Sequence, residues 1–90
     1  MVSVLDRAWG LAPQVSVRPE RFGALLYHFG TRRLSFVKDP RLLTVVQALA
    51  EAPSARDACD HAGVEASALS EYEQAIERLA ATDMLIERAP

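Results

Sequence analysis

The stretch that most constrains the fold spans residues 22–38 and consists of the letters FGALLYHFGTRRLSFVK. Two runs rich in apolar and aromatic side chains flank the dipeptide Gly30-Thr31, a pattern typical of two strands joined by a tight loop. Glycine at the first position of a two-residue loop favours a type II′ turn, because that position requires a positive φ. The stretch therefore predicts a β-hairpin with Gly30 and Thr31 as its loop.

The position of this loop sets the strand register. Tyr27 is expected opposite Leu34 and Leu25 opposite Phe36, so that four large apolar side chains share one face. We expect these four residues to form the sheet half of the core. The stretch holds four of the six aromatic residues of the chain, and this interpretation makes most of that concentration structural. The opposite face carries a mixed set, namely Ala24, Leu26, His28, Arg33, Ser35 and Val37.

The remaining elements follow from periodicity and from start and stop signals. Asp39 and Ser54 are suited to cap helices, and Pro40 to occupy the first helical position. The expected elements are an arm at residues 1–13, a strand at Gln14–Arg18 ended by Pro19, helices at residues 40–52, 55–62 and about 68–82, and a short final strand at residues 84–87. This order predicts an α+β fold, winged-helix-like, with a three-stranded antiparallel sheet followed by three helices.

Composition narrows the class of protein. The 90 residues are expected to form one domain over residues 1–90, and no apolar run is long enough to cross a bilayer. The first residues include Asp6 and lack a sustained apolar core, which argues against a signal peptide. One cysteine, Cys59, allows no internal disulfide and fits a cytoplasmic protein.

Residues suited to chemistry are scarce. Cys59 and His61 are two apart on a predicted helix and point in different directions, so a core cysteine is the better interpretation. With His28 they show no metal-ligand spacing. The carboxylates of the third predicted helix fit a solvated face, and no glycine-rich phosphate loop is present. We therefore expect neither an enzyme, nor a metal, nor a cofactor.

Charge separates two kinds of binding protein. Residues 1–53 carry seven basic and four acidic side chains, whereas residues 54–90 carry three and eight. A winged-helix domain would place its third helix on nucleic acid, but that helix has several acids and the single basic residue Arg78. Because phosphate contacts need Lys and Arg, nucleic-acid binding is the alternative function and not the favoured one.

An exposed sheet edge offers another function. If the second hairpin strand, at residues 32–38, is an edge, its backbone could accept an extended peptide by β-strand addition. It could also pair two copies of the chain in a homodimer. Its basic residues Arg32, Arg33 and Lys38 could instead serve only to protect the edge from aggregation, and the pattern alone leaves these alternatives open.

The segment RPERFGALLYHFGTRRLSFVK, followed by a capped helix at Pro40, resembles the signature of the mycofactocin-system peptide chaperones. These are small leader-recognition domains related to the pyrroloquinoline quinone peptide chaperone. The resemblance extends from Trp9 through the third predicted helix, and the hairpin is its specific part.

The resemblance implies a function without catalysis. Members bind the leader of a ribosomally made precursor peptide and present it to a radical S-adenosylmethionine maturase. The leader adds as a strand beside the third strand, in a groove shared with the third helix. Carried onto this chain, the implied peptide-binding residues are Arg33, Leu34, Ser35, Phe36, Val37 and Lys38 on the strand, and Tyr72, Ala75, Ile76 and Leu79 on the helix.

Overall fold

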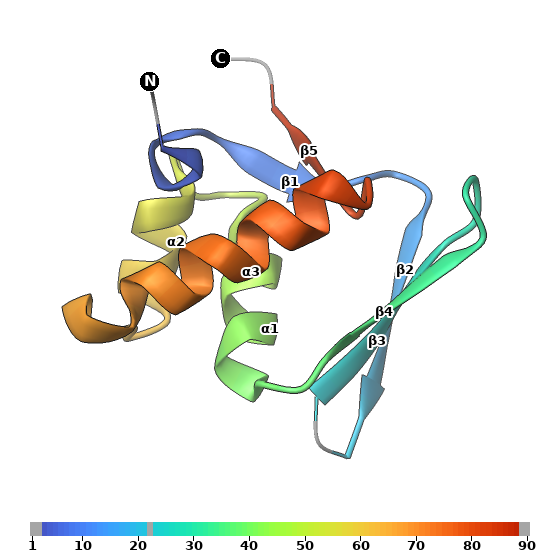
Figure 1. Cartoon of the computed structure of the whole chain (residues 1–90), viewed down its shortest axis with the longest axis horizontal. Helices are drawn as coiled ribbons and strands as arrows, with labels where there is room; N and C mark the ends of the chain where they lie inside the picture. The colour runs from blue at the N-terminus through green and yellow to red at the C-terminus, as the bar shows by residue number, and fades with distance from the viewer. Residues whose placement is uncertain (1–2, 22, 89–90) are drawn as a thin grey trace.

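The computed structural model describes residues 3–21 and 23–88 (Figure 1). Phe22, one of the hairpin aromatics, lies outside the described residues. The elements are a 3-10 helix η1 (Val4–Asp6), strands β1 (Trp9–Leu11), β2 (Val15–Glu20), β3 (Gly23–His28) and β4 (Arg33–Val37), helices α1 (Pro40–Ala48) and α2 (Ala55–His61), a 3-10 helix η2 (Ala66–Ala68), helix α3 (Leu69–Ala81) and strand β5 (Leu85–Glu87). The expected α+β class with three strands followed by three helices is confirmed.

Strands β2, β3 and β4 form one antiparallel sheet in that order. The predicted register is confirmed, because Tyr27 pairs with Leu34 and Leu25 with Phe36. The predicted end of the first strand is wrong, since β2 continues through Pro19 to Glu20. Proline is tolerated there because β2 is an edge strand, where an N–H is not needed for a neighbour.

The predicted two-residue type II′ turn is wrong. Four residues, 29–32, join the strands, and the positive φ belongs to Arg32 (61°), not to Gly30. The side chain of His28 explains the difference, because its Nδ1 accepts hydrogen bonds from the backbone N–H groups of Gly30 (3.0 Å) and Thr31 (3.1 Å). His28 is consequently buried.

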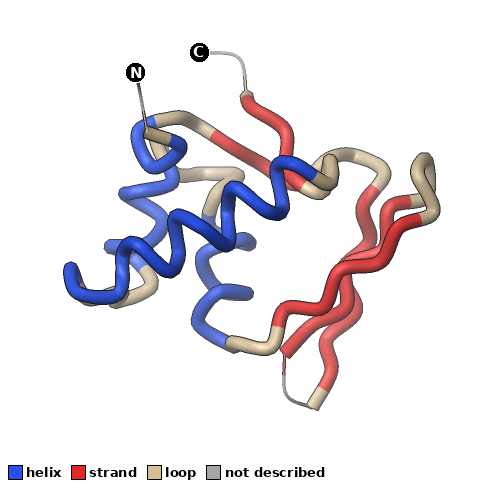
Figure 2. The backbone as a smooth tube through the Cα atoms, in the orientation of Figure 1, coloured by secondary structure: helices blue, strands red, loops and turns tan. Residues whose placement is uncertain are grey.

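The face of the hairpin that enters the core is the opposite of the predicted one. Leu34 and Phe36 are exposed, and their partners Leu25 and Tyr27 are only half-buried. The buried face is the mixed one, with Ala24, Leu26, His28 and Val37. All helices lie on this side of the three-stranded sheet, and no described element covers its outer face (Figure 2).

The inner face packs closely because its apolar side chains are small or of medium size. Leu26 and Val37 join Val45, Val46 and Ile76 from the helices in one core. The polar members of this face do not oppose burial, since His28 is hydrogen-bonded and Arg33 at the strand end reaches solvent. Alternation alone could not show this, because both faces carry apolar residues.

The helices begin where the sequence predicts. Asp39 caps α1 by accepting from Arg41 N–H, and Ser54 caps α2 by accepting from Asp57 N–H. α1 ends at Ala48, four residues before the expected end, and the chain then turns toward α2. Cys59 is fully buried, as expected for a core cysteine. No helix within the described residues is long and apolar enough to span a membrane.

The segment predicted to be an N-terminal arm is integrated into the domain over its described residues. Leu5 and Trp9 are buried, and the indole N–H of Trp9 donates to the Val4 carbonyl (2.9 Å). β1 pairs with β5 in a second, two-stranded sheet, and these two strands lie beside α3 at the end of the helical layer (Figure 1). The short final strand is therefore confirmed, with a partner that the sequence did not indicate.

Candidate functional site

The hydrogen bonds at the end of β3 show which neighbour each of its residues faces. The Phe29 N–H donates to the Gln14 carbonyl (2.9 Å), next to β2. The His28 carbonyl accepts from the Arg32 N–H (2.7 Å), on the side of β4. Successive residues of an antiparallel strand bond to opposite neighbours. His28, Leu26 and Ala24 of β3 therefore bond toward β4.

This alternation identifies the free backbone groups of β4. The register partners of those β3 residues are Arg33, Ser35 and Val37, which therefore bond to β3. The residues between them, Leu34 and Phe36, direct their N–H and C=O groups away from β3. Since β4 is the last strand of its sheet, these groups lie on an open edge.

The other edge of the sheet is less open. By the same alternation, Val15, Val17 and Pro19 of β2 point their backbones outward. The Val15 N–H already donates to the Ala12 carbonyl (2.9 Å), and Pro19 has no N–H to offer. β4 is therefore the edge better able to accept a further strand.

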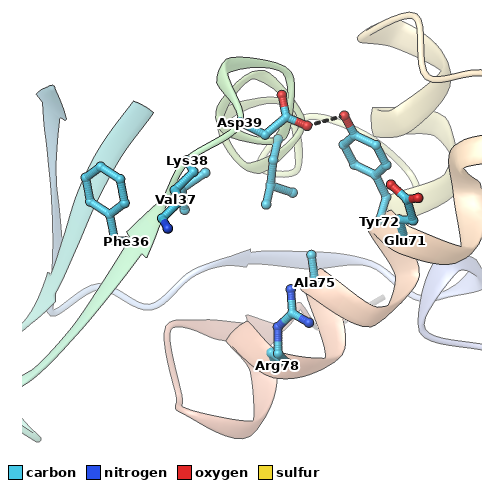
Figure 3. A pocket seen from close by; sticks show the side chains of 9 residues that line it. Phe36, Val37, Lys38, Asp39, Glu71, Tyr72, Ala75 and Arg78 are labelled. Carbon is cyan, nitrogen blue, oxygen red and sulfur yellow. Dashed lines mark hydrogen bonds between the residues drawn. The ribbon is translucent and has the colours of Figure 1, made fainter. Parts of the chain in front are cut away.

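A groove runs along the open edge, between β4 and α3. Two adjoining hollows of about 310 and 240 Å³ form it and share Phe36, Val37, Leu42, Ala75 and Arg78. Figure 3 shows the α3 side chains facing the end of β4 across this space. Lys38, Asp39, Glu71 and Tyr72 line one end, and Ser35, Leu79 and Thr82 line the other.

The structure brings seven of the ten sequence-predicted site residues to this groove. They are Ser35, Phe36, Val37 and Lys38 from β4 and its end, and Tyr72, Ala75 and Leu79 from α3. The other three lie elsewhere. Ile76 is fully buried in the core, Arg33 is exposed at the start of β4, and Leu34 is exposed on the outer face of the sheet.

Five residues of the groove are absent from the prediction, namely Asp39, Leu42, Glu71, Arg78 and Thr82. Helical spacing was the signal for three of them, because Glu71, Arg78 and Thr82 lie four, three and seven residues from Ala75, on the same stripe of α3. Asp39 and Leu42 follow β4 directly, and only the angle at which α1 leaves the strand brings them to the groove.

Tyr72 and Asp39 close one end of the groove with a hydrogen bond. The Tyr72 hydroxyl donates to Asp39 Oδ2 at 2.5 Å (Figure 3). This bond, with smaller contributions from backbone N–H groups, lowers the pKa of Asp39. Burial, assisted by the neighbouring carboxylate, raises the pKa of Tyr72 to about 12. The phenol is therefore neutral and the carboxylate charged at neutral pH, which is the pairing that this bond requires.

The charges of the groove are distributed along its length. Arg78 borders its middle, while Lys38 and Glu71 lie near the Tyr72 end. α3 also exposes Glu77. An acidic exposed face of α3 would repel a nucleic-acid duplex, in agreement with the charge argument from the sequence.

The groove offers binding groups and no catalytic constellation. Among the described residues, no group of three or more His, Cys, Asp or Glu side chains could hold a metal ion. Burial raises the pKa of the Cys59 thiol, which disfavours the reactive thiolate. What the site provides is an apolar floor, a few charges and an unpaired strand edge.

The comparisons of this chain with protein families and with known proteins agree on one family. The family described as "Peptide chaperone MftB family" matches residues 8–86. A "Peptide chaperone MftB" of Mycobacterium tuberculosis is 55% identical over 83 residues, covering 92% of this chain and 76% of that protein. Proteins of the same name are 54% identical in Mycobacterium ulcerans (90% and 74% covered) and 48% identical in Mycolicibacterium smegmatis (94% and 83% covered). No solved structure matches the chain.

Proposed function

The chain belongs to the peptide chaperone MftB family, and on that premise we propose that it is a non-catalytic chaperone of mycofactocin biosynthesis. It binds the leader of a ribosomally synthesised precursor peptide and presents this peptide to a radical S-adenosylmethionine maturase. The observation that carries the proposal is the open edge of β4 beside an apolar groove. An extended peptide needs both features, since backbone bonds give affinity and side-chain pockets give selectivity.

In this mechanism the peptide becomes a fourth strand of the sheet. Its backbone bonds to the outward N–H and C=O groups of Leu34 and Phe36, which sets its register. Its inward side chains lie opposite Ser35 and Val37 and enter the groove toward Ala75 of α3. β4 and α3 thus act as two walls, held at their distance by the shared core and by the bond between Tyr72 and Asp39.

The contribution to catalysis is proximity. A chaperone that holds the leader and also contacts the maturase raises the local concentration of the reacting end of the peptide without taking part in the reaction. Basic residues near the edge, including Lys38 and Arg78, would speed the encounter with an acidic leader more than they would tighten the complex. Leader binding is thus the property that separates this function from that of a merely structural accessory subunit.

Leu34→Pro, compared with Leu34→Ala, tests strand addition. Both changes replace the branched leucine side chain with a smaller one, but only proline removes the outward N–H. An outward N–H on an edge strand can be lost without breaking the hairpin, so both variants should fold, which circular dichroism checks. With a synthetic leader of a mycofactocin precursor peptide, we expect the proline variant to bind about tenfold more weakly than the alanine variant.

Equal affinity of two folded variants would contradict strand addition at this edge. Binding of the maturase without any leader binding by the native chain would instead identify a structural accessory subunit. Ser35→Pro is unsuited to this test, because the Ser35 backbone bonds to β3 and its loss would damage the hairpin itself.

A further inference from the structure

The outer face of the three-stranded sheet becomes more exposed toward the β4 edge. In the central strand β3, Leu25 and Tyr27 are half-buried by their neighbours on both sides. In the edge strand, Leu34 is 61% and Phe36 48% exposed, although both are large and apolar. Exposed apolar groups gathered in one place mark an interaction surface more often than a solvated one.

The two edges of the sheet differ in what they present on this face. At the β2 edge, the partners of Tyr27 and Leu25 are Ser16 and Arg18, both polar and exposed. Arg18 also forms a surface ion pair with Glu20 (3.4 Å). β2 is thus built as a solvated edge, with polar side chains and a proline, whereas β4 has the side chains of a strand that has a neighbour.

We propose that the strand added to β4 is recognised on both of its faces, so that the bound leader segment is apolar at consecutive positions. This inference rests on the proposed function. Residues of the added strand that lie opposite Leu34 and Phe36 project onto the outer face and cover these two side chains. The alternate residues, opposite Ser35 and Val37, project into the groove. A segment of about five residues therefore contacts apolar side chains of the protein on both of its faces.

Continuity between the two surfaces supports this assignment. Phe36 lies on the outer face and also borders the groove, so the outer apolar surface and the groove meet at β4. A peptide that used only the groove would leave Leu34 in water beside its own outward side chains. One that used both surfaces would bury Leu34, which lines no part of the groove, and would gain affinity from the apolar area removed from water.

Charge favours a peptide over a second copy of the chain. Antiparallel pairing of two β4 strands about Ser35 would place Leu34 opposite Phe36, but it would also place Arg32 opposite Lys38 at both ends. Like charges directly opposite each other destabilise a strand pair. The same basic residues would favour a leader segment whose apolar residues are flanked by acidic ones.

Leu34→Thr tests the outer half of this recognition, because threonine keeps the N–H and the strand propensity but removes most of the apolar surface. Ile86→Thr is the control, since Ile86 is also a large exposed apolar residue (43%) but lies on β5, in the other sheet. With the labelled synthetic leader, we expect Leu34→Thr to weaken binding about tenfold and Ile86→Thr to leave it within about twofold of the native chain.

The outcomes separate this inference from the proposed function. Native affinity of Leu34→Thr, combined with weak binding of Leu34→Pro, would overturn two-faced recognition and leave strand addition standing. An equal loss in Ile86→Thr would also overturn it, because exposed apolar side chains would then contribute to binding wherever they lie. If the native chain forms a dimer that Leu34→Thr dissociates, the β4 edge binds a second copy of the chain and not the leader. Absence of leader binding by the native chain would overturn both proposals.

A complementary test changes the peptide. The leader segment that binds β4 is first located as the segment whose amide hydrogen exchange the native chain slows. Two variant peptides are then made, in which serine replaces either the odd-numbered or the even-numbered apolar residues of this segment. Two-faced recognition predicts that both peptides bind at least about tenfold more weakly than the parent. If only one of the two loses affinity, the bound strand is recognised on one face and the inference is wrong.

Discussion

At the scale of single residues, the bond between Tyr72 and Asp39 connects the end of β4 to α3. Asp39 has two tasks, because it caps α1 and accepts the Tyr72 hydroxyl. Tyr72 in turn buries its ring in the core while its hydroxyl reaches the groove. Tyr72 therefore belongs both to the core and to the lining of the groove.

Tyr72→Phe removes this bond and keeps the ring. We expect the free energy of unfolding to fall by about 1–2 kcal/mol, since the acceptor is charged. Urea denaturation measures the change, with Tyr27→Phe on the outer sheet face as the control. A loss no greater than that of the control would show that the bond does not stabilise the fold.

The bond between Tyr72 and Asp39 also makes the stability difference between the native chain and Tyr72→Phe depend on pH. The raised pKa of Tyr72 means that its contribution is complete below pH 10, the ordinary value, and is lost as pH rises toward about 12. The lowered pKa of Asp39 means that its contribution is complete above its ordinary value of 3.8 and is lost as pH falls through the lower folded value. The native chain and Tyr72→Phe should therefore differ at neutral pH and converge at both extremes.

At the scale of elements, the hairpin shows what a sequence pattern can and cannot specify. The alternation of residues 24–37 and the central Gly30-Thr31 predicted the strands and their register, because register follows from the spacing around the loop. The buried face was predicted wrongly, because side-chain size was used to choose between two partly apolar faces. The larger side chains lie outside, and only the position of the helices decides this.

Alanine substitutions on the two faces measure this arrangement. Leu26→Ala should lower the free energy of unfolding by about 2–5 kcal/mol, because Leu26 is fully buried in the core. Leu34→Ala should change it by no more than about 0.5 kcal/mol, because Leu34 is exposed. Chemical denaturation of both variants compares them directly. A larger loss of unfolding free energy in Leu34→Ala than in Leu26→Ala would instead support the sequence prediction that the face with Leu34 is buried.

The candidate site could be predicted in part for related reasons. Carried from the family resemblance, seven of the ten site residues line the groove, because β4 and α3 each have a defined side that faces the other. Ile76 does not line the groove, because α3 packs it into the core. The contributions of Asp39 and Leu42 could not be predicted, because they depend on how α1 follows β4.

At the scale of the whole molecule, the sheet has one open and one protected edge. Helices cover its inner face, β1 and β5 extend the helical side, and the outer face remains uncovered (Figures 1 and 2). On β2, a bonded Val15 and a proline leave few backbone groups for a partner. On β4, outward backbone groups, exposed apolar side chains and the groove occur together. This asymmetry directs a peptide to one edge.

Amide hydrogen exchange of the native chain, with and without the synthetic leader, tests this account most directly. Strand addition at β4 predicts that the leader slows exchange of the outward amides of Leu34 and Phe36 and leaves that of Val17, the outward amide of β2, unchanged. Unaltered exchange at Leu34 and Phe36 when the leader is bound, or equal slowing at Val17, would contradict the assignment of β4 as the binding edge.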